Sequence, residues 1–255
     1  MWSSYVAIGD SFTEGMNDLR DDGSLRGWAD RVATAMASEQ PGFRYANLAV
    51  RGKLVHQIVA DQIPRAIAMR PQLVSLFGGV NDLLRPRVDL DRVTGLVDAG
   101  VRDLRSAGID VVLFLGGGPS RAAGSNGRGR IRARIVALNE AIARTALRYD
   151  CRVVDIGVPE VFVHPDMWSE DRLHMSSLGH ERIAAAVCEA LDVRHAGRES
   201  WRDPVEPTAP VPWVTARRSD LHWARTYLAP WVARRIRGRS SGDGRLPKRP
   251  ELTGI

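Results

Sequence analysis

Ser11, Asp171 and His174 are the residues of this sequence best suited to nucleophilic chemistry. A serine hydroxyl is a weak nucleophile, so it needs a neighbouring base to take its proton. A histidine acts as that base when a carboxylate fixes its tautomer and stabilises its charged form. Asp171 and His174 are three residues apart, so one loop or helical turn can supply both. The set predicts Ser11 as nucleophile, His174 as base and Asp171 as the residue that orients the base.

Each part of this set also has a plain structural interpretation. Ser11 lies in Gly9-Asp10-Ser11, directly after an apolar run, and a serine or aspartate at such a place can simply cap a helix. Asp171 and His174 can equally be two polar residues of a solvated loop. Asp10 is expected to shape the turn rather than take part in the chemistry.

Gly52 and Asn81 are candidate hydrogen-bond donors for the same chemistry. When a nucleophile adds to an acyl group, negative charge develops on the carbonyl oxygen, and a fixed donor there is worth roughly 3 kcal/mol. A glycine N–H and an asparagine amide are suitable donors. The alternative is that Gly52 serves a turn and that Asn81 or Asp82 caps a helix.

Short apolar runs alternate with longer amphipathic runs over the first 195 residues. The expected strands are residues 5–8, 45–48, 73–77, 111–115 and 152–155, and the expected helices are residues 28–38, 54–63, 90–107, 131–149 and 177–191. This alternation indicates βαβ units and a parallel sheet with helices on both faces. Ligands bind such a sheet just beyond the carboxyl ends of its strands. Ser11, Gly52 and Asn81 all follow expected strands, so we expect them at one edge of the sheet.

Four segments, in this order, resemble the four blocks that define the SGNH hydrolases of the GDSL lipase/esterase superfamily. The resemblance spans residues 4–191, and Phe12 stands where many members have leucine. The four segments are Gly9-Asp10-Ser11-Phe12-Thr13-Glu14-Gly15, residues 47–52, Gly79-Val80-Asn81-Asp82 and Asp171-Arg172-Leu173-His174, the last followed by Gly179-His180.

The resemblance implies an α/β protein with a three-layer α/β/α, flavodoxin-like fold and about five parallel strands. It implies that Ser11 attacks the acyl carbonyl, that His174 relays the proton and that Asp171 orients His174. The oxyanion is expected to be held by the N–H groups of Ser11 and Gly52 and by the Asn81 side chain. An acyl-enzyme forms and is hydrolysed, and no metal or organic cofactor is implied.

The expected activity is hydrolysis of acyl (carboxylic) esters of a small-molecule substrate. A second hypothesis is a carbohydrate O-acetylesterase or an acyltransferase that uses the same triad. A third is a binding protein on an inactive scaffold, which the intact set of site residues argues against. Residues 116–130, expected as a mobile loop, and residues 164–168 are expected to line the pocket.

The net charge of +6 arises entirely in the last part of the chain. Residues 1–195 carry 24 basic and 24 acidic residues, whereas residues 196–255 carry 12 basic and 6 acidic. We expect residues 1–195 to form the catalytic domain and residues 196–255 a Pro- and Arg-rich extension. In that extension we predict a short helix near residues 219–237, interrupted at Pro230, and a flexible basic tail from Gly238. Removal of residues 238–255 is expected to leave the catalytic rate nearly unchanged.

The extension has two interpretations. Its aromatic residues interleave with arginines, which can suit an anionic surface such as a membrane, with nucleic acid the less favoured partner. Alternatively, the aromatic rings pack on the hydrolase and the arginines face water, and this second interpretation is favoured.

Composition limits the remaining classes. No apolar run approaches the roughly 20 residues of a membrane span, and no signal peptide precedes the first strand. Cys151 and Cys188 are too few for a disulfide framework, and the histidines show no metal-binding spacing. The sequence therefore predicts a cytoplasmic enzyme.

Overall fold

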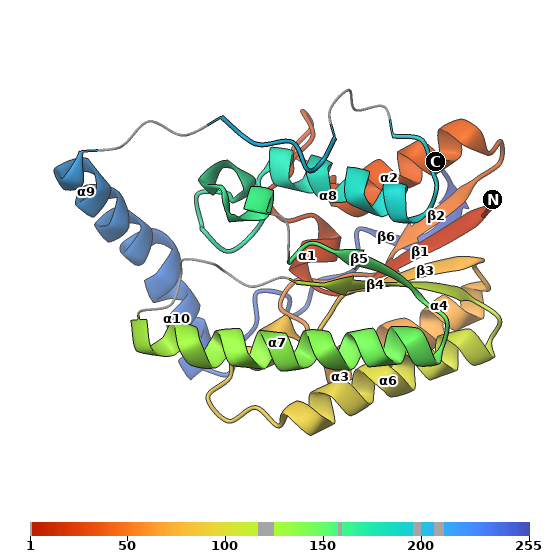
Figure 1. The fold of residues 1–255 in the computed structure, drawn as a ribbon, viewed down its shortest axis with the longest axis horizontal. Coiled ribbons are helices and arrows are strands. Elements are labelled where there is room, and N and C mark those ends of the chain that lie inside the picture. The colour runs from red at the N-terminus through yellow and green to blue at the C-terminus, as the bar shows by residue number, and fades with distance from the viewer. Residues whose placement is uncertain (1, 117–124, 158–159, 196–199, 207–211) are drawn as a thin grey trace.

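The computed structural model describes residues 2–116, 125–157, 160–195, 200–206 and 212–255 (Figure 1). A six-stranded sheet of order β5-β4-β3-β1-β2-β6 forms its centre. Five strands are parallel, and the sixth runs antiparallel to β2. The strands are β1 (Ser4–Ile8), β2 (Arg44–Asn47), β3 (Leu73–Leu76), β4 (Asp110–Leu115), β5 (Arg152–Asp155) and β6 (Arg249–Gly254).

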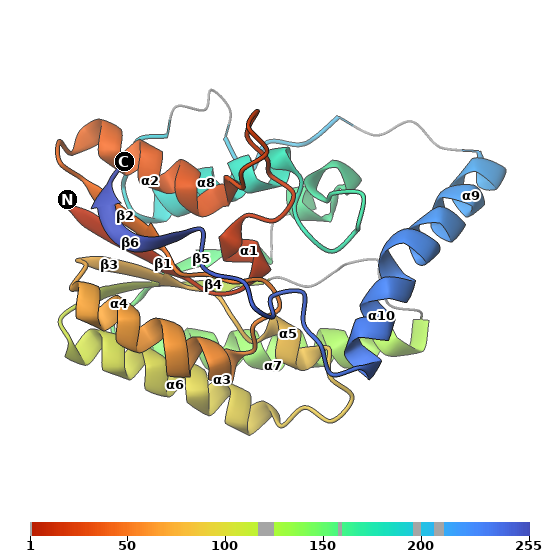
Figure 2. The ribbon, with the colours of Figure 1, turned by 180° about the vertical axis from the view of Figure 1, so that it is seen from behind.

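Helices cover both faces of the sheet, as Figures 1 and 2 show. One face carries α2 (Gly27–Glu39) and α8 (Ser177–Ala190). The opposite face carries α3 (Val55–Gln57), which continues through the π-helical segment η1 (Ile58–Gln62) into α4 (Ile63–Met69), together with α6 (Leu90–Ser106) and α7 (Ser125–Arg148). The shorter elements are α1 (Ser11–Glu14), α5 (Val80–Leu83), η2 (Glu160–Val163) and η3 (Pro165–Met167). The predicted three-layer α/β/α fold is confirmed.

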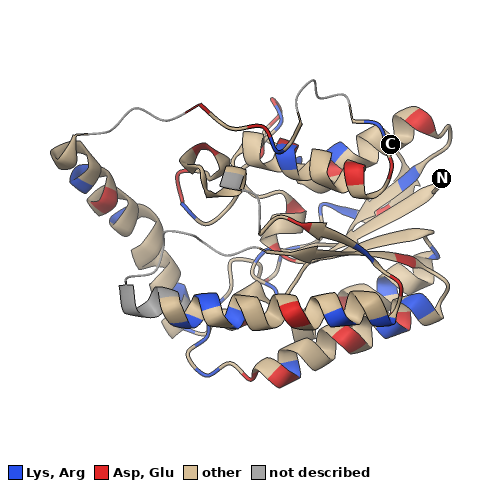
Figure 3. Ribbon diagram, in the orientation of Figure 1, with Lys and Arg blue, Asp and Glu red and all other residues tan. Residues whose placement is uncertain are grey.

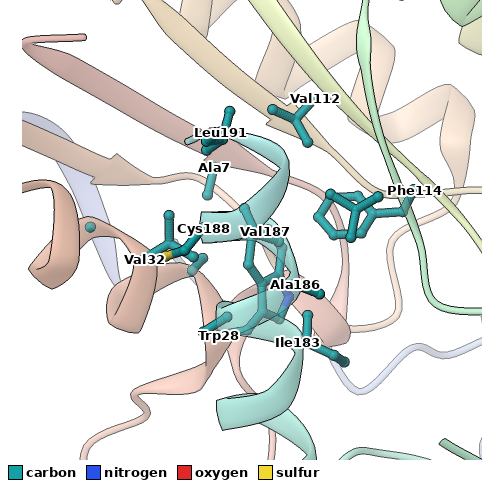
Figure 4. Packing of buried hydrophobic residues seen from close by; sticks show 14 of the residues in the cluster. Ala7, Trp28, Val32, Val112, Phe114, Ile183, Ala186, Val187, Cys188 and Leu191 are labelled. Carbon is teal, nitrogen blue, oxygen red and sulfur yellow. The ribbon is translucent and has the colours of Figure 1, made fainter. Parts of the chain in front are cut away.

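The alternation of side chains along β1 explains the two cores. Tyr5 and Ala7 belong to the cluster beneath α2 and α8, whereas Val6 and Ile8 belong to the cluster on the other face. Successive residues of a strand point to opposite faces, and a central parallel strand is apolar on both. In Figure 4 Trp28 of α2 packs among α8 side chains and Phe114 of β4. This packing fixes α2 and α8 against the sheet.

The chain reverses its direction of travel across the sheet between β1 and β3. From β1 it moves to β2 on one side, and from β3 it continues through β4 to β5 on the other. This is the topological switch point at which doubly wound sheets bind ligands. The segments that follow β1 and β3 begin with Gly9 and Phe77, and they carry Ser11 and Asn81.

The five strands predicted from sequence agree with the structure to within one residue at each end. Helix α7 begins at Ser125, earlier than predicted, so residues 125–130 are helical rather than part of a loop. The rest of the predicted glycine-rich loop, residues 117–124, lies outside the described residues.

The prediction of a flexible tail is wrong for the residues that form β6. Arg249–Gly254 pairs with β2, and the Arg249 side chain donates to the Tyr45 main-chain oxygen at 3.0 Å. Lys248 adds an ion pair with Asp30 at 2.9 Å. The unpaired edge of β2 offers main-chain partners that the polar sequence of the tail can use. The chain end is therefore fastened to the sheet.

The helix of the extension is longer than predicted. It comprises α9 (Trp213–Trp223), the π-helical segment η4 (Ala224–Leu228) and α10 (Ala229–Ile236), and it passes through Pro230 without a break. A proline ring clashes with the carbonyl group of the preceding turn, and a wider π turn makes room for the ring. The wide turn of η4 immediately before Pro230 explains why the predicted interruption does not occur.

Candidate active site

Ser11 opens the short helix α1 directly after β1. Asp10 caps this helix, and its carboxylate accepts from the Phe12 N–H at 3.1 Å. A Cβ atom at Gly9 would lie 2.5 Å from the Phe77 oxygen, so only glycine allows β1 and the segment after β3 to approach this closely. The turn from strand to helix therefore presents Ser11 at the carboxyl edge of the sheet.

Ser11, His174 and Asp171 form a continuous hydrogen-bonded chain. His174 Nε2 lies 2.9 Å from Ser11 Oγ, and His174 Nδ1 lies 2.7 Å from Asp171 Oδ2. The contact between Ser11 and His174 joins residues that are 163 positions apart in the sequence. This geometry lets the imidazole accept the hydroxyl proton at Nε2 while its Nδ1–H group donates a hydrogen bond to the Asp171 carboxylate.

The Asp171 carboxylate is held by hydrogen bonds from a side chain and from main-chain N–H groups of its own loop. Its Oδ1 atom accepts from the N–H groups of Leu173 and His174, each at 2.9 Å, and from Ser169 Oγ at 2.7 Å. Burial alone raises the pKa of this carboxyl, but the hydrogen bond and charge of His174 and the two main-chain donors outweigh it. The pKa of Asp171 therefore falls well below its usual range. A carboxylate that stays ionised is suited to stabilise a charged imidazole.

Asn17 is a site residue that sequence reasoning missed. Its Nδ2 donates to Asp171 Oδ2 at 2.8 Å and to Ser169 Oγ at 2.7 Å. Asn17 has a φ of 68°, a left-handed conformation that asparagine tolerates better than most residues. Nothing in its local sequence points to a residue more than 150 positions away.

Asn81 lies beside the turn that carries Ser11, and its side-chain amide already makes two hydrogen bonds. Its Nδ2 donates to Asp10 Oδ2 at 2.9 Å and to the Lys53 main-chain oxygen at 3.2 Å. Helix α5, which carries Asn81, begins after Gly79, whose φ is 98°. The structure thus brings Asn81 to the edge of the sheet where the sequence predicted it, and it shows Asp10 as the side chain that orients its amide.

Asp10 is a buried carboxyl in contact with this predicted donor. Burial raises its pKa to about 7, even though the Phe12 N–H bond and the nearby His174 favour the charged form. The charges of Asp82 and Glu14 add to the rise. Asp10 therefore does more than shape the turn, because its carboxylate also holds the amide of Asn81.

The Gly52 loop is fastened to α1. Arg51 donates from its main-chain N–H to Glu14 Oε2 at 2.7 Å, and its guanidinium pairs with the same carboxylate at 2.7 Å. Gly52 has a φ of 73°, and a Cβ there would lie 2.1 Å from Ser240 Oγ. The loop is therefore held between α1 on one side and the C-terminal extension on the other.

A family model identifies the family to which this fold belongs. The model of the GDSL-like lipase/acylhydrolase family matches residues 7–182. This chain belongs to that family. It is accordingly an esterase or lipase of the GDSL/SGNH type, as the four sequence blocks predicted. No curated protein matches the chain.

Solved structures share the GDSL-type fold at low sequence identity. LAE5, an alpha/beta hydrolase enzyme from the metagenome of Lake Arreo, Spain, has 22% identity and a TM-score of 0.62 over 74% of this chain and 95% of its own. Axe2, an acetylxylan esterase from Geobacillus stearothermophilus, has 19% identity and a TM-score of 0.61 over 77% and 97%. TesA has 21% identity and a TM-score of 0.60 over 74% and 97%.

The GDSL-like family model ends at Arg182, yet residues far beyond it contact the site. Trp223 Nε1 donates to the Asp171 main-chain oxygen at 2.8 Å. Arg172 pairs with Asp220 at 2.7 Å, and its guanidinium lies 5.2 Å from the centre of the Trp223 ring. Tyr227 donates to Glu170 at 3.2 Å. The extension therefore braces the loop that carries Asp171 and His174.

His180, which the family block contains, has a structural place in this GDSL-type site. Its Nδ1 accepts from the Trp28 N–H at 3.2 Å, and Nε2–H donates to the Met16 oxygen at 3.0 Å. Burial lowers its pKa to about 4, so it is neutral. In the described residues, no group of three or more His, Cys, Asp or Glu is arranged to hold a metal ion.

Proposed function

We propose that the protein hydrolyses carboxylic esters through Ser11, His174 and Asp171 and an acyl-enzyme intermediate. The observation that carries the proposal is the hydrogen-bonded chain from Ser11 Oγ through the imidazole to the Asp171 carboxylate, at 2.9 and 2.7 Å. Ser11 Oγ attacks the acyl carbon as His174 Nε2 takes the hydroxyl proton. The imidazolium that forms is stabilised by Asp171 and then gives its proton to the leaving alcohol. Water activated by the same imidazole releases the acid and restores Ser11.

The oxyanion is proposed to bind the N–H groups of Ser11 and Gly52 and the side-chain amide of Asn81. For Asn81 to take part, one of its two present hydrogen bonds must give way. The bond to the Lys53 oxygen is the longer and weaker of the two, at 3.2 Å against 2.9 Å to Asp10, so it is the one expected to give way. Asp10 then holds the amide while its second N–H turns to the substrate.

The proposed substrate is a small-molecule ester. A carbohydrate O-acetyl ester is the alternative, because one structural neighbour, Axe2, is an acetylxylan esterase. An acyltransferase would use the same three side chains, with an acceptor alcohol in place of water. We propose the cytoplasm as the site of action, since Cys151 and Cys188 are both free thiols. None of the helices in the described residues is long and apolar enough to cross a membrane.

The test is hydrolysis of p-nitrophenyl esters from acetate to palmitate by the full chain and by Ser11→Ala. We expect Ser11→Ala to lower the rate by at least about a thousandfold without unfolding the protein. Ser38→Ala, at an exposed serine of α2, is the matched control and should keep the wild-type rate. Preference for acetate would support a small-acyl or sugar acetyl ester, and preference for long chains a lipid ester.

A second readout does not depend on the choice of substrate. A fluorophosphonate probe should label Ser11, and peptide mapping should find the adduct there and not in Ser11→Ala. Labelling without turnover of any ester would favour a transferase or a narrow substrate. Full activity of Ser11→Ala, or labelling elsewhere, would overturn the mechanism.

A further inference from the structure

The rod formed by α9, η4 and α10 lies at one side of the molecule (Figures 1 and 2). The exposure of its side chains differs between two faces. One face is half-buried and contacts the catalytic loop through Asp220, Trp223 and Tyr227. These residues are three and four positions apart, so they share one side of the helix. No residue of α9 or η4 is fully buried. The rod is therefore attached along a single stripe.

The opposite face exposes a row of large apolar side chains. Leu221 is 60% exposed and Ile236 is 82% exposed. The exposed row consists of Val214, Leu221, Leu228, Val232 and Ile236. Single exposed apolar residues are ordinary, but several of them along one face of a helix indicate an interaction surface.

Basic residues accompany this row. Arg218 and Arg225 are exposed and stand four residues from Val214 and Leu221 respectively, on the same face. Arg217 and Arg234 are further arginines of the rod, and Asp220, its acidic residue, pairs with Arg172 at 2.7 Å and with Arg217 at 3.6 Å. Figure 3 colours the basic and acidic positions along α9. Arginine can lay its aliphatic stem along apolar groups while its charge reaches outward.

We infer that this outer face binds the surface of an anionic lipid bilayer. A helix with leucine, valine and isoleucine on one face, arginines beside them and Trp213 exposed at its end has the features of an interfacial helix. A second copy of the chain is disfavoured because Arg218 and Arg225 of two copies would meet. Nucleic acid accounts for the arginines but not for the aliphatic row.

The location of the face gives this contact a consequence. The rod is roughly 10 Å thick, and its inner face touches Asp171 through Trp223. A bilayer on the outer face therefore lies about one helix diameter from the catalytic loop. The inference concerns where the protein binds and does not rest on the proposed ester hydrolysis.

The experiment is co-sedimentation of the full chain with vesicles of phosphatidylcholine, with and without phosphatidylglycerol. Wild type should bind the anionic vesicles in a salt-sensitive way and the neutral ones weakly. Arg218→Gln with Arg225→Gln should weaken binding roughly thirtyfold, since each arginine near an anionic surface contributes about one kcal/mol. Leu221→Glu with Leu228→Glu should abolish it.

Matched controls use α7, whose C-terminal end lies away from the rod (Figure 1). Leu147→Glu removes a leucine that is 86% exposed, more than Leu221, and Arg144→Gln removes an exposed arginine. Both should bind as wild type, and circular dichroism should show every variant folded. Equal binding by the rod variants and controls would overturn the inference. Light scattering that shows a dimer, dissociated by Leu221→Glu, would also overturn it. Binding to duplex DNA but not to vesicles would do the same.

Discussion

The indole nitrogen of Trp223 donates a 2.8 Å hydrogen bond to the main-chain oxygen of Asp171. It thereby ties the C-terminal extension to the residue that is proposed to orient the catalytic histidine. Arg172, the next residue, has a φ of 56°, an uncommon conformation for a side chain of its size. The Asp220 ion pair and the Trp223 ring hold it there. The loop geometry thus depends on residues outside the family match.

Trp223→Phe tests this dependence. A smaller aromatic ring remains but the N–H donor is lost, so we expect kcat to fall about fivefold, the equivalent of one hydrogen bond, with KM little changed. The control is Trp213→Phe, at a tryptophan that is 70% exposed on the same helix. Wild-type kcat for Trp223→Phe on a p-nitrophenyl ester would show that the loop holds its geometry without the extension.

The C-terminal strap, residues 238–248, is expected to matter for activity, contrary to what the sequence alone suggested. A Cβ at Gly242 would lie 1.9 Å from the Arg51 oxygen, and Ser240 sits against Gly52. Gly242→Ala should push the strap from the Gly52 loop, destabilise the fold by about 1–3 kcal/mol and lower kcat/KM. Urea unfolding and ester hydrolysis measure the two effects.

Gly254→Ala is the matched control for this strap. The space around Gly254 is open, so its added methyl group meets nothing within 4 Å. If Gly242→Ala and Gly254→Ala have the same kcat/KM, the strap does not position the Gly52 loop.

Much of the site could be predicted because its parts follow strand ends. Ser11 comes after β1 and Asn81 after β3, and parallel strands bring their carboxyl ends to one edge. The four family blocks then located Asp171 and His174. The pattern that revealed the strands depends on buried apolar residues: every residue of β1 and β3 is buried, as are most residues of β2 and β4.

The missed parts lack such a signal. Strand β6 lacks an apolar run and contains Pro250, so its sequence is typical of a disordered segment. Proline is tolerated there because β6 is an edge strand. Asn17 and Trp223 act through hydrogen bonds to a loop distant in sequence, and only the tertiary structure pairs them.

Asp10 should make the fold less stable as pH rises from about 4 to 7. Its pKa is raised from 3.8 to about 7 by burial, so the folded state keeps a proton that the unfolded state has lost. The stabilisation is complete below pH 4 and is lost as pH approaches 7, by at most roughly 4 kcal/mol. Asp10→Asn cannot titrate and should lack this loss. Urea unfolding at pH 4.5 and pH 8 measures the difference between wild type and variant, and an unchanged difference at the two pH values would contradict the assignment.

His180 should act in the opposite direction over an overlapping pH range. Burial lowers its pKa from 6.5 to about 4, so the unfolded state takes up a proton that the folded state refuses. Its contribution is complete above pH 6.5 and is lost as pH falls toward 4, by at most roughly 3 kcal/mol. His180→Gln offers an acceptor for the Trp28 N–H and a donor for the Met16 oxygen without titrating. Relative to wild type, it should therefore lose less stability between pH 7.5 and pH 4.5 in urea unfolding. Parallel losses in the two proteins would mean that His180 is not held neutral by its burial.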